Sequence, residues 1–323
     1  MGAPQMRLRT ILPAVLAVLT LAGITACGDV GQPVDLARVN EAQRPLPQNA
    51  GEPEPVDDEP APDCGDPTAS LRPNSDISAG STMAKIRERG YLIAGIDQNT
   101  YLFGFRNPNT GQMEGFDIDV TRAIANALLG DPNKVQFRAL TSAQRVPALQ
   151  DGDVDIVART MTMTCGRWQD INFSSEYYTA GQRLLVNANS RAESLEDLRG
   201  RNVCSAKGST SIDRIAEAGG KPLQVDNWSD CLVVLQQGQV AGVTTDDSIL
   251  AGMAAQDPNT KIVGPRFSTE PYGIGIPKEN EDMVRYVNSV LDDFRGGEWA
   301  RSYGRWLSEL GAPPRPPAPK YQD

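Results

Sequence analysis

Short apolar segments alternate with segments of helical spacing through most of this chain, and no other feature restricts the fold as strongly. Strands are predicted at 91–96, 134–140, from Val154, and then at 182–186, 202–206, 222–226 and 239–244. Helices are predicted between them, around 120–128, at 146–149 after a Ser142 cap, and then at 209–218, 228–237 and 246–255. This order is typical of α/β domains whose parallel sheets are covered by helices on both faces.

Two further helices, at 279–295 and 298–309, close the folded part of the chain. Their apolar residues recur at helical spacing, so we expect them in a core and not around a cofactor. Residues from about 80 to 310 suffice for two modest α/β domains. The Pro-rich tail, 311–323, is expected to be an extended end without packing of its own.

The first residues predict export. Arg7 and Arg9 precede an apolar run, 11–24, that is too short for a comfortable membrane span, as in a secretory signal. The run ends in Ile-Thr-Ala-Cys and resembles a bacterial lipoprotein signal. That resemblance implies cleavage after residue 26 and acylation of Cys27. The alternative is an ordinary signal peptide with an incidental cysteine.

Residues 27–63 are predicted to be an acidic, Pro-rich tether. They carry nine acidic and two basic side chains and almost no aromatic or β-branched residues, so they cannot bury a core. The net charge of −10 for the whole chain therefore mostly reflects this segment. No basic stripe exists that could release counterions from a phosphate backbone, which argues against nucleic acid as a partner.

Four cysteines remain once Cys27 is assigned to the lipid: Cys64, Cys165, Cys204 and Cys231. An even number in an exported protein predicts two disulfides, for which three pairings exist. We favour Cys204 with Cys231, which lie at predicted element edges in one half of the chain, and Cys64 with Cys165. A zinc site is the alternative, but the chain has no histidine and no Cys-x-x-Cys pair.

Polar side chains follow the predicted strand at Val154. Thr160 and Thr162 would share one side of an extended chain, and Arg167 comes shortly after them. Ligands often bind where parallel strands end, and arginine can hold a carboxylate through two parallel hydrogen bonds. The alternative is a polar loop with a solvated arginine.

Four more residues suggest a ligand site: Ser209, Thr210, Asp246 and Arg145. Ser209 and Thr210 follow the strand at 202–206 and would open a helix, whose free amides suit an anion. Asp246 follows the strand at 239–244 and could receive an ammonium group. For these residues the alternative is ordinary helix capping, and for Arg145 it is a solvated helix position. Taken together, the cationic, hydroxyl and anionic groups suit a zwitterion.

Taken in order, these segments resemble the bacterial extracytoplasmic solute-binding proteins of family 3, which serve ABC importers of polar amino acids. The resemblance covers about 81–310 and rests on GIDQNTYLFGF, EGFDIDV, VPALQDGDVDIV, TMTMTCGR, NFSSEYY, NVCSAKGSTS, VTTDDS and PYGIGIPK. In closer detail the chain is similar to the actinobacterial glutamate/glutamine-binding lipoproteins. Cys165-Gly166 replaces the Pro-Glu or Asp-Glu more common in the family, which supports a disulfide there.

The resemblance implies a two-lobed periplasmic-binding-protein fold of type II. Each lobe would be a parallel-rich sheet flanked by helices, and two hinge crossovers would let the lobes close on a ligand. Lobe 1 would comprise 64–180, lobe 2 would comprise 181–270, and 271–310 would return to lobe 1. The crossovers are expected near 178–183 and 268–272.

The resemblance also implies roles for single residues. Arg167 would hold the α-carboxylate of the ligand, assisted by Thr160, Thr162, Ser209 and Thr210. Asp246 would pair with the α-ammonium group, and Arg145 would meet a side-chain carboxylate. Asp97 would contact the ligand, and Tyr101 and Phe103 would wall the pocket. Arg159 is an unusual extra cation, for which the alternative is a solvent-facing position.

The implied function is binding of L-glutamate or L-aspartate, with glutamine or asparagine weaker, and delivery to an ABC permease. The protein would be anchored by its lipid to the outer face of the cell membrane, and no cofactor is expected. One alternative is a sensor whose closed form signals to a transmembrane receptor. Another is an enzyme on the same fold, of dehydratase or lytic type, although the chain has no histidine for a conventional triad.

Overall fold

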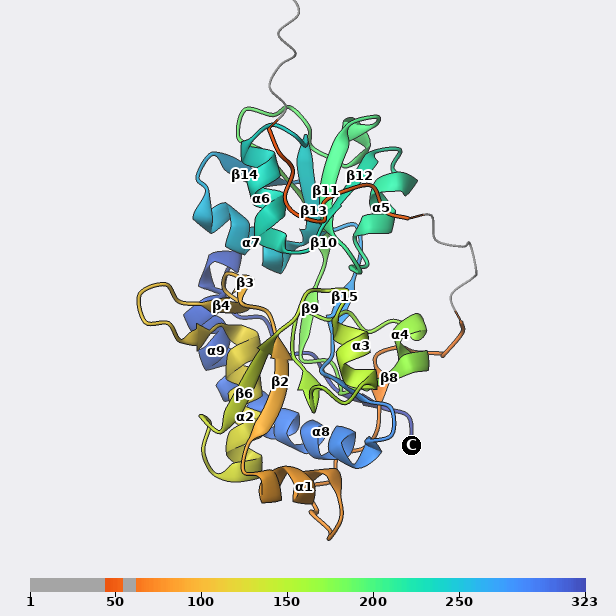
Figure 1. Ribbon diagram of the computed structural model, residues 1–323, viewed down its shortest axis with the longest axis vertical. Helices are drawn as coiled ribbons and strands as arrows, with labels where there is room; N and C mark the ends of the chain where they lie inside the picture. Colours follow the sequence, from red (N-terminus) through yellow and green to blue (C-terminus); the bar gives the residue numbers. More distant parts are fainter. Residues whose placement is uncertain (1–43, 55–61) are drawn as a thin grey trace, which may run out of the picture. The chain divides into compact units, whose positions relative to one another are not determined.

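The computed structural model describes residues 44–54 and 62–323, and residues 45–323 form one compact unit. Cys27, the signal segment 1–26 and residues 28–43 and 55–61 of the tether lie outside the described residues. Within the unit, two five-stranded sheets form separate lobes that are joined by a two-stranded connection (Figure 1). No helix in the described ranges is long and apolar enough to cross a membrane.

The sheet of lobe 1 has the order β6-β2-β7-β16-β8. Its strands are β2 (Leu92–Ile96), β6 (Val135–Ala139), β7 (Ile156–Val157), β8 (Ile171–Phe173) and β16 (Gly275–Pro277). The helices of this lobe are α1 (Thr82–Arg89), α2 (Phe116–Leu129), α3 (Arg145–Gln150), α4 (Cys165–Asp170), α8 (Glu281–Arg295) and α9 (Glu298–Trp306). β2 runs parallel to β6 and β7, whereas β16 runs antiparallel to β7 and β8.

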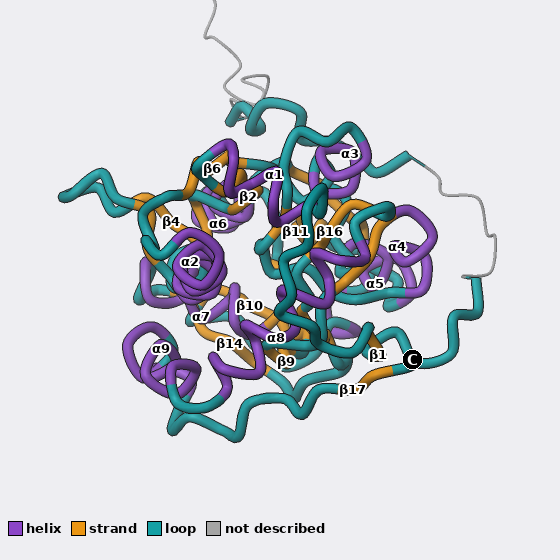
Figure 2. Tube along the Cα trace, turned by 90° about the horizontal axis from the view of Figure 1, so that it is seen from below, coloured by secondary structure: helices purple, strands orange, loops and turns teal. Residues whose placement is uncertain are grey.

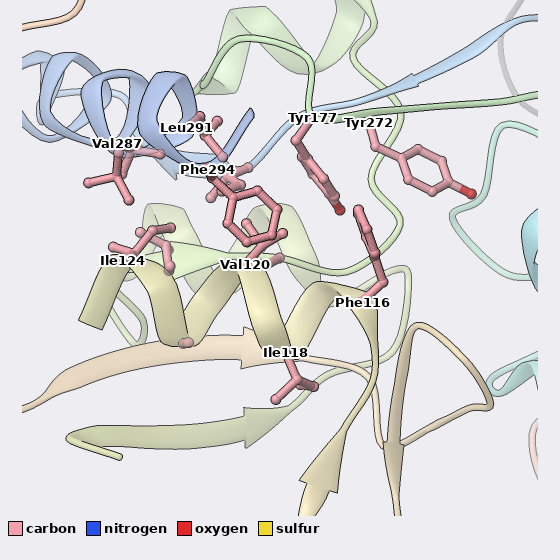
Figure 3. Packing of buried hydrophobic residues seen from close by; sticks show 14 of the residues in the cluster. Phe116, Ile118, Val120, Ile124, Tyr177, Tyr272, Val287, Leu291 and Phe294 are labelled. Atoms are coloured by element: carbon pink, nitrogen blue, oxygen red, sulfur yellow. The ribbon is translucent and has the colours of Figure 1, made fainter. Parts of the chain in front are cut away.

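The core of lobe 1 lies where α2 packs against α8 and α9. Phe116, at the start of α2, is fully buried and makes edge contacts with the rings of Phe294 and Trp299. Figure 3 shows the side chains of α2 meeting those of α8, while Tyr272 points its hydroxyl away from them. Because each large side chain contributes about 1.5–3 kcal/mol when buried, this cluster holds the terminal helices on lobe 1.

The sheet of lobe 2 has the order β12-β11-β13-β10-β14. Its strands are β10 (Gln182–Asn187), β11 (Asn202–Ala206), β12 (Lys221–Val225), β13 (Gly242–Asp246) and β14 (Thr260–Val263). Its helices are α5 (Ile212–Glu217), α6 (Trp228–Gln236) and α7 (Asp247–Gln256), with a 3₁₀ turn, η2, at Glu196–Leu198. β11 is parallel to β12 and β13, whereas β10 is antiparallel to β13 and β14.

The chain passes between the lobes twice. β9 (Tyr178–Ala180) leads from lobe 1 to lobe 2, and β15 (Glu270–Tyr272) leads back. The two strands pair antiparallel, so the crossovers lie side by side between the sheets (Figure 1). Short antiparallel crossovers of this kind suit a hinge between two rigid bodies.

Smaller elements complete the fold and correct one expectation. β3 (Asn99–Thr100), β4 (Gly104–Arg106) and β5 (Met113–Glu114) form a three-stranded sheet, and η3 spans Ser308–Leu310. The expectation of a tail without packing was wrong. β17 (Lys320–Tyr321) pairs with β1 (Ala69–Ser70), which Figure 2 shows side by side, and the Tyr321 hydroxyl donates to Asp292.

Three other expectations need correction. The helix predicted from 209 begins only at Ile212, and Ser142 does not cap α3, whose N-cap residue is Gln144. Part of the predicted tether is bound to lobe 2, because Gly51 exchanges two backbone hydrogen bonds with Gln224 at the edge strand β12. That pairing gives partners to backbone groups at the open edge of the sheet. Apolar periodicity in the sequence does not show which segment will pair with a sheet edge.

Both favoured disulfides are present in the structure. Cys204 of β11 is bonded to Cys231 of α6, and Cys64 is bonded to Cys165 at the start of α4. Cys204 and Cys231 are fully buried in the core of lobe 2. The bond from Cys64 therefore fixes the end of the tether beside the segment that carries Arg167.

Replacing Cys204 and Cys231 together with alanine is expected to lower the free energy of unfolding by about 2–4 kcal/mol. The bond closes a segment with a sequence separation of 27, so its loss returns that chain entropy to the unfolded state. Thermal unfolding followed by circular dichroism measures the effect relative to the oxidised wild type, which has both disulfides. An unchanged unfolding temperature would contradict this pairing.

Candidate ligand-binding site

A narrow polar cavity lies between the lobes and is lined mainly by hydroxyl, guanidinium and carboxylate groups. The lining residues are Ser142, Arg145, Thr160, Thr162 and Arg167 of lobe 1 and Ser209, Thr210, Ser211, Trp228, Thr245, Asp246 and Ile249 of lobe 2. Other hollows, around Phe267 and around Arg122, are each lined by one lobe only. The interlobe cavity brings predicted binding groups from both lobes together.

Arg167 reaches the cavity from α4. The helix begins at Cys165 because Thr164 caps it, its hydroxyl accepting from the amide of Arg167 at 3.2 Å. The guanidinium of Arg167 donates to the carbonyl of Thr162 at 2.6 Å and to that of Gly208 at 3.1 Å. Burial lowers the pKa of Arg167 to about 10, while the nearby carboxylates of Glu270 and Asp246 oppose that shift. The group therefore remains a cation at neutral pH.

Arg145, at the start of α3, is the second cation of the cavity and is only 3% exposed. Its guanidinium donates to the carbonyl oxygens of Ser142, Arg159, Thr160 and Gly208 at 2.9–3.2 Å. Burial, followed by repulsion from Arg167 and Arg159, lowers its pKa well below the usual value. Within 44–54 and 62–323, every acceptor of this guanidinium is a neutral carbonyl, so a carboxylate brought beside it would relieve that repulsion.

Thr160 has a backbone conformation that β-branched residues rarely adopt, with φ at +39°. A buried carboxylate holds it there, because the amide of Thr160 donates to Asp117 at 2.9 Å. The hydroxyl of Tyr177 donates to the other oxygen of Asp117 at 2.7 Å. Burial raises the pKa of Asp117 to about 7. The regular alternation expected from Thr160 to Thr162 is therefore broken, although both residues line the cavity.

Asp246 ends β13 at the N-cap position of α7, but its side chain makes no capping hydrogen bond. Its Oδ2 accepts from the Tyr272 hydroxyl at 2.5 Å, and its Oδ1 is buried with no hydrogen-bond partner among the described residues. Burial, followed by the charge of Glu270, raises the pKa of Asp246 to about 8. A buried, unpaired carboxylate oxygen is costly, and a cationic donor in the cavity would satisfy it.

Ser209 and Thr210 contribute hydroxyl groups from the turn before α5. The hydroxyl of Ser209 donates to the carbonyl of Ala206 at 2.7 Å. Thr210 of lobe 2 and Thr162 of lobe 1 both donate to Oε2 of Glu270, at 2.9 and 2.8 Å. Glu270, in the returning crossover β15, therefore connects the two lobes behind the cavity.

Asp97, Tyr101 and Phe103 do not line the cavity. The Asp97 carboxylate lies 2.7 Å from the guanidinium of Arg159, which is fully buried, so the solvent-facing position considered for Arg159 was wrong. Asp97 supplies the opposite charge that makes such burial tolerable. Phe103 is buried against Phe116. Tyr101 is 36% exposed, and its ring contacts that of Phe105.

Sequence reasoning missed several residues of the site. Ser142, Ser211, Trp228, Thr245 and Ile249 line the cavity, and Glu270 and Tyr272 accept from or donate to residues that line it. Glu270 and Tyr272 lie in the crossover that was predicted only as a connection, and Trp228 begins α6. The acidic and aromatic residues of the segment Glu-Pro-Tyr, placed at a hinge, were the available signal for the first two. Trp228 carried no such signal, because its apolar spacing fits a helix in a core.

The cationic groups of the cavity and its acidic group come from different lobes. Two guanidinium groups come from lobe 1, on α3 and α4, and an unpaired carboxylate oxygen comes from lobe 2, at the end of β13. Hydroxyl groups from both lobes also line the cavity. Such a site could bind a small molecule that carries both a carboxylate and an ammonium group.

Similarity to known proteins identifies the family of this chain. Residues 92–309 match the family of bacterial extracellular solute-binding proteins, family 3. An ABC transporter glutamine-binding protein, GlnH, of Bacillus subtilis is 38% identical over 236 residues, which cover 72% of this chain and 86% of the relative. The glutamate-binding protein GluB of Corynebacterium glutamicum is 32% identical over 231 residues, 67% of this chain and 78% of the relative.

A solved structure shows the same architecture. An ancestral arginine-binding protein bound to glutamine is similar with a TM-score of 0.64 and 37% sequence identity, over 68% of this chain and 98% of that chain. The expected two-lobed, type II fold is confirmed. The family match covers more than half of the chain. The protein is therefore a member of the bacterial extracellular solute-binding proteins, family 3, and a binding protein, not an enzyme.

Proposed function

We propose that this protein binds a polar amino acid between its lobes, prefers glutamate or aspartate to glutamine or asparagine, and delivers the ligand to an ABC permease. The observation that carries the preference is Arg145, a buried cation whose described acceptors are all neutral carbonyls. A second carboxylate buried without such a partner would cost several kcal/mol, so an acidic ligand needs this cation.

The proposed ligand is held at its two charged ends. Arg167 binds the α-carboxylate, with the hydroxyl groups of Thr162, Ser209 and Thr210 around it. The unpaired Oδ1 of Asp246 accepts from the α-ammonium group. Arg145 then meets the side-chain carboxylate of glutamate or aspartate. With lobe boundaries at about 180 and 270, the groups proposed to hold the ligand come from both lobes.

The relatives support the class of ligand and the transport role. The Bacillus relative is named as a glutamine-binding protein of an ABC transporter, and the Corynebacterium relative as a glutamate-binding protein. These names include an acid and an amide, so the preference within the class rests on Arg145. We further propose export and lipid anchoring at Cys27, which rests on the signal and the Ile-Thr-Ala-Cys sequence alone.

A thermal-shift screen over the amino acids, followed by calorimetry, tests the function. Glutamate and aspartate are expected to raise the unfolding temperature most, because a ligand that binds only the folded protein stabilises the folded state. They are also expected to bind at least about tenfold more tightly than glutamine and asparagine. Arginine is expected to have no effect, because two cations already face the cavity. If no amino acid raises the unfolding temperature, the function is wrong; if glutamine binds more tightly than glutamate, the preference is wrong.

Ligand binding is expected to release a proton near pH 7. The raised pKa of about 8 means that Asp246 holds a proton in the free protein at pH 7, whereas an ammonium group beside it favours the ionised form. Affinity should therefore fall as the pH drops below 8. Calorimetry at pH 7 in buffers of different ionisation enthalpy measures the release. It should vanish in the Asp246→Asn variant, and identical heats in all buffers would contradict this assignment.

A further inference from the structure

The two lobes touch at two places where lobe 2 contributes a glycine. Gly208 lies in the turn between β11 and α5, and Gly252 lies within α7. An ideal Cβ on Gly208 would lie 2.7 Å from the Cα of Ala143, and one on Gly252 would lie 2.4 Å from the carbonyl oxygen of Tyr101. Both neighbours belong to lobe 1. Each glycine thus lets the backbone of one lobe lie directly against the backbone of the other.

These neighbours are backbone atoms of firmly held segments, and they cannot turn aside as a long side chain would. Ala143 immediately precedes the N-cap residue of α3, two positions before Arg145. Tyr101 follows β3, which contacts both α6 and α7. Asn99 of β3 also donates to Asn227 of lobe 2 at 3.3 Å. Because packed interiors accept little added volume, a methyl group at either position would have to push the lobes apart.

Gly208 also joins the lobes through its carbonyl oxygen. This oxygen accepts from the guanidinium groups of both Arg145 and Arg167, each at 3.1 Å. The same two cations line the cavity. The approach of Gly208 to lobe 1 therefore also sets how near Ser209 and Thr210 come to the two cations.

We propose that Gly208 and Gly252 determine how far the lobes close on the ligand, because at each of them the absent side chain lets the lobe backbones meet. The inference rests on the proposed function, since closure affects affinity only for a ligand held between the lobes. It adds two positions that contribute no side chain to the cavity and yet determine its size.

Alanine at either position is expected to weaken the binding of L-glutamate by about 10- to 100-fold. To relieve contacts of 2.7 and 2.4 Å, the lobes must separate by about 1 Å, which lengthens every hydrogen bond across the cavity. The two substitutions oppose the same motion. Their effects should therefore be less than additive in the Gly208→Ala/Gly252→Ala double variant.

Two matched controls separate closure from the intrinsic cost of replacing a glycine. Gly200, also in lobe 2, has φ +72°, close to the +74° of Gly208, but nothing lies within 4 Å of its Cβ position. Gly304 lies in α9 as Gly252 lies in α7, and its Cβ position is also open. Gly200→Ala and Gly304→Ala therefore carry the same backbone costs, and both are expected to bind within about twofold of the wild type.

Calorimetry with L-glutamate gives the affinities, and fluorescence transfer between dyes on the two lobes gives the closure. The inference requires weaker binding and a longer interlobe distance with ligand in Gly208→Ala and Gly252→Ala, but not in the controls. If Gly208→Ala fails to fold, Gly252→Ala alone tests the inference. Gly252 lies within α7, and alanine favours a helix more than glycine does, so this variant is expected to fold. Wild-type affinity in either folded variant, or weaker binding with unchanged closure, overturns the inference alone. A wild type that binds no amino acid overturns the proposed function as well.

Discussion

Replacing Arg167 with alanine is expected to weaken the binding of every amino acid ligand by at least about 30-fold. Acids and amides share the α-carboxylate, and the guanidinium of Arg167 is proposed to bind it. Truncating one partner of a desolvated, hydrogen-bonded charge pair costs about 2–5 kcal/mol, which corresponds to a loss of this size. Calorimetry with glutamate and glutamine measures the loss, which should be similar for the two ligands.

The local structure should survive the Arg167→Ala substitution. The capping bond of α4 uses the backbone amide of residue 167, which alanine retains, and the disulfide at Cys165 is unaffected. Arg214→Ala is the matched control, since that side chain is about half exposed, pairs only with Glu217 in the described part of the chain, and lies outside the cavity lining. If Arg167→Ala binds as tightly as Arg214→Ala, the carboxylate is held elsewhere.

The order of strands and helices could be predicted because burial imposes a period on the sequence. The strand at 202–206 was located without error, and the neighbouring elements were displaced by one to three residues. Strand direction was harder to predict, because apolar periodicity is the same in parallel and antiparallel strands. β10 and β16 both run antiparallel to the strands beside them, since each follows directly from a crossover between the lobes.

Most of the predicted polar groups of the cavity follow a strand, whereas Arg145 lies at the start of α3 and its role was implied by the family resemblance. Arg167, Ser209, Thr210 and Asp246 were found because they follow a strand, and all of them line the cavity. Asp97 also follows a strand, but it pairs with the buried Arg159. No spacing in the sequence distinguishes a carboxylate that faces a ligand from one that faces a cation in the core. The strained backbone of Thr160 was likewise hidden, because it depends on a hydrogen bond to Asp117, 43 residues earlier.

Replacing Arg145 with alanine is expected to weaken glutamate binding by about 150- to 5,000-fold and glutamine binding by less than about tenfold. The proposed role of this cation is to meet the side-chain carboxylate, which glutamine lacks. An uncompensated carboxylate in a buried site costs about 3–5 kcal/mol, whereas an amide there loses only an ordinary hydrogen bond. Calorimetry with the two ligands under one set of conditions gives the ratio of the two losses.

The ratio is decisive because Arg145 also has a structural part. Its removal leaves the carbonyl oxygens of Ser142, Arg159, Thr160 and Gly208 without this donor, which should weaken all ligands alike and lower the unfolding temperature. Arg145→Lys keeps the charge but loses the fork of donors, so it should restore part of the preference for glutamate without restoring the stability. Equal losses of affinity for glutamate and glutamine would mean that Arg145 has only a structural role. The proposed preference for an acidic ligand would then be contradicted.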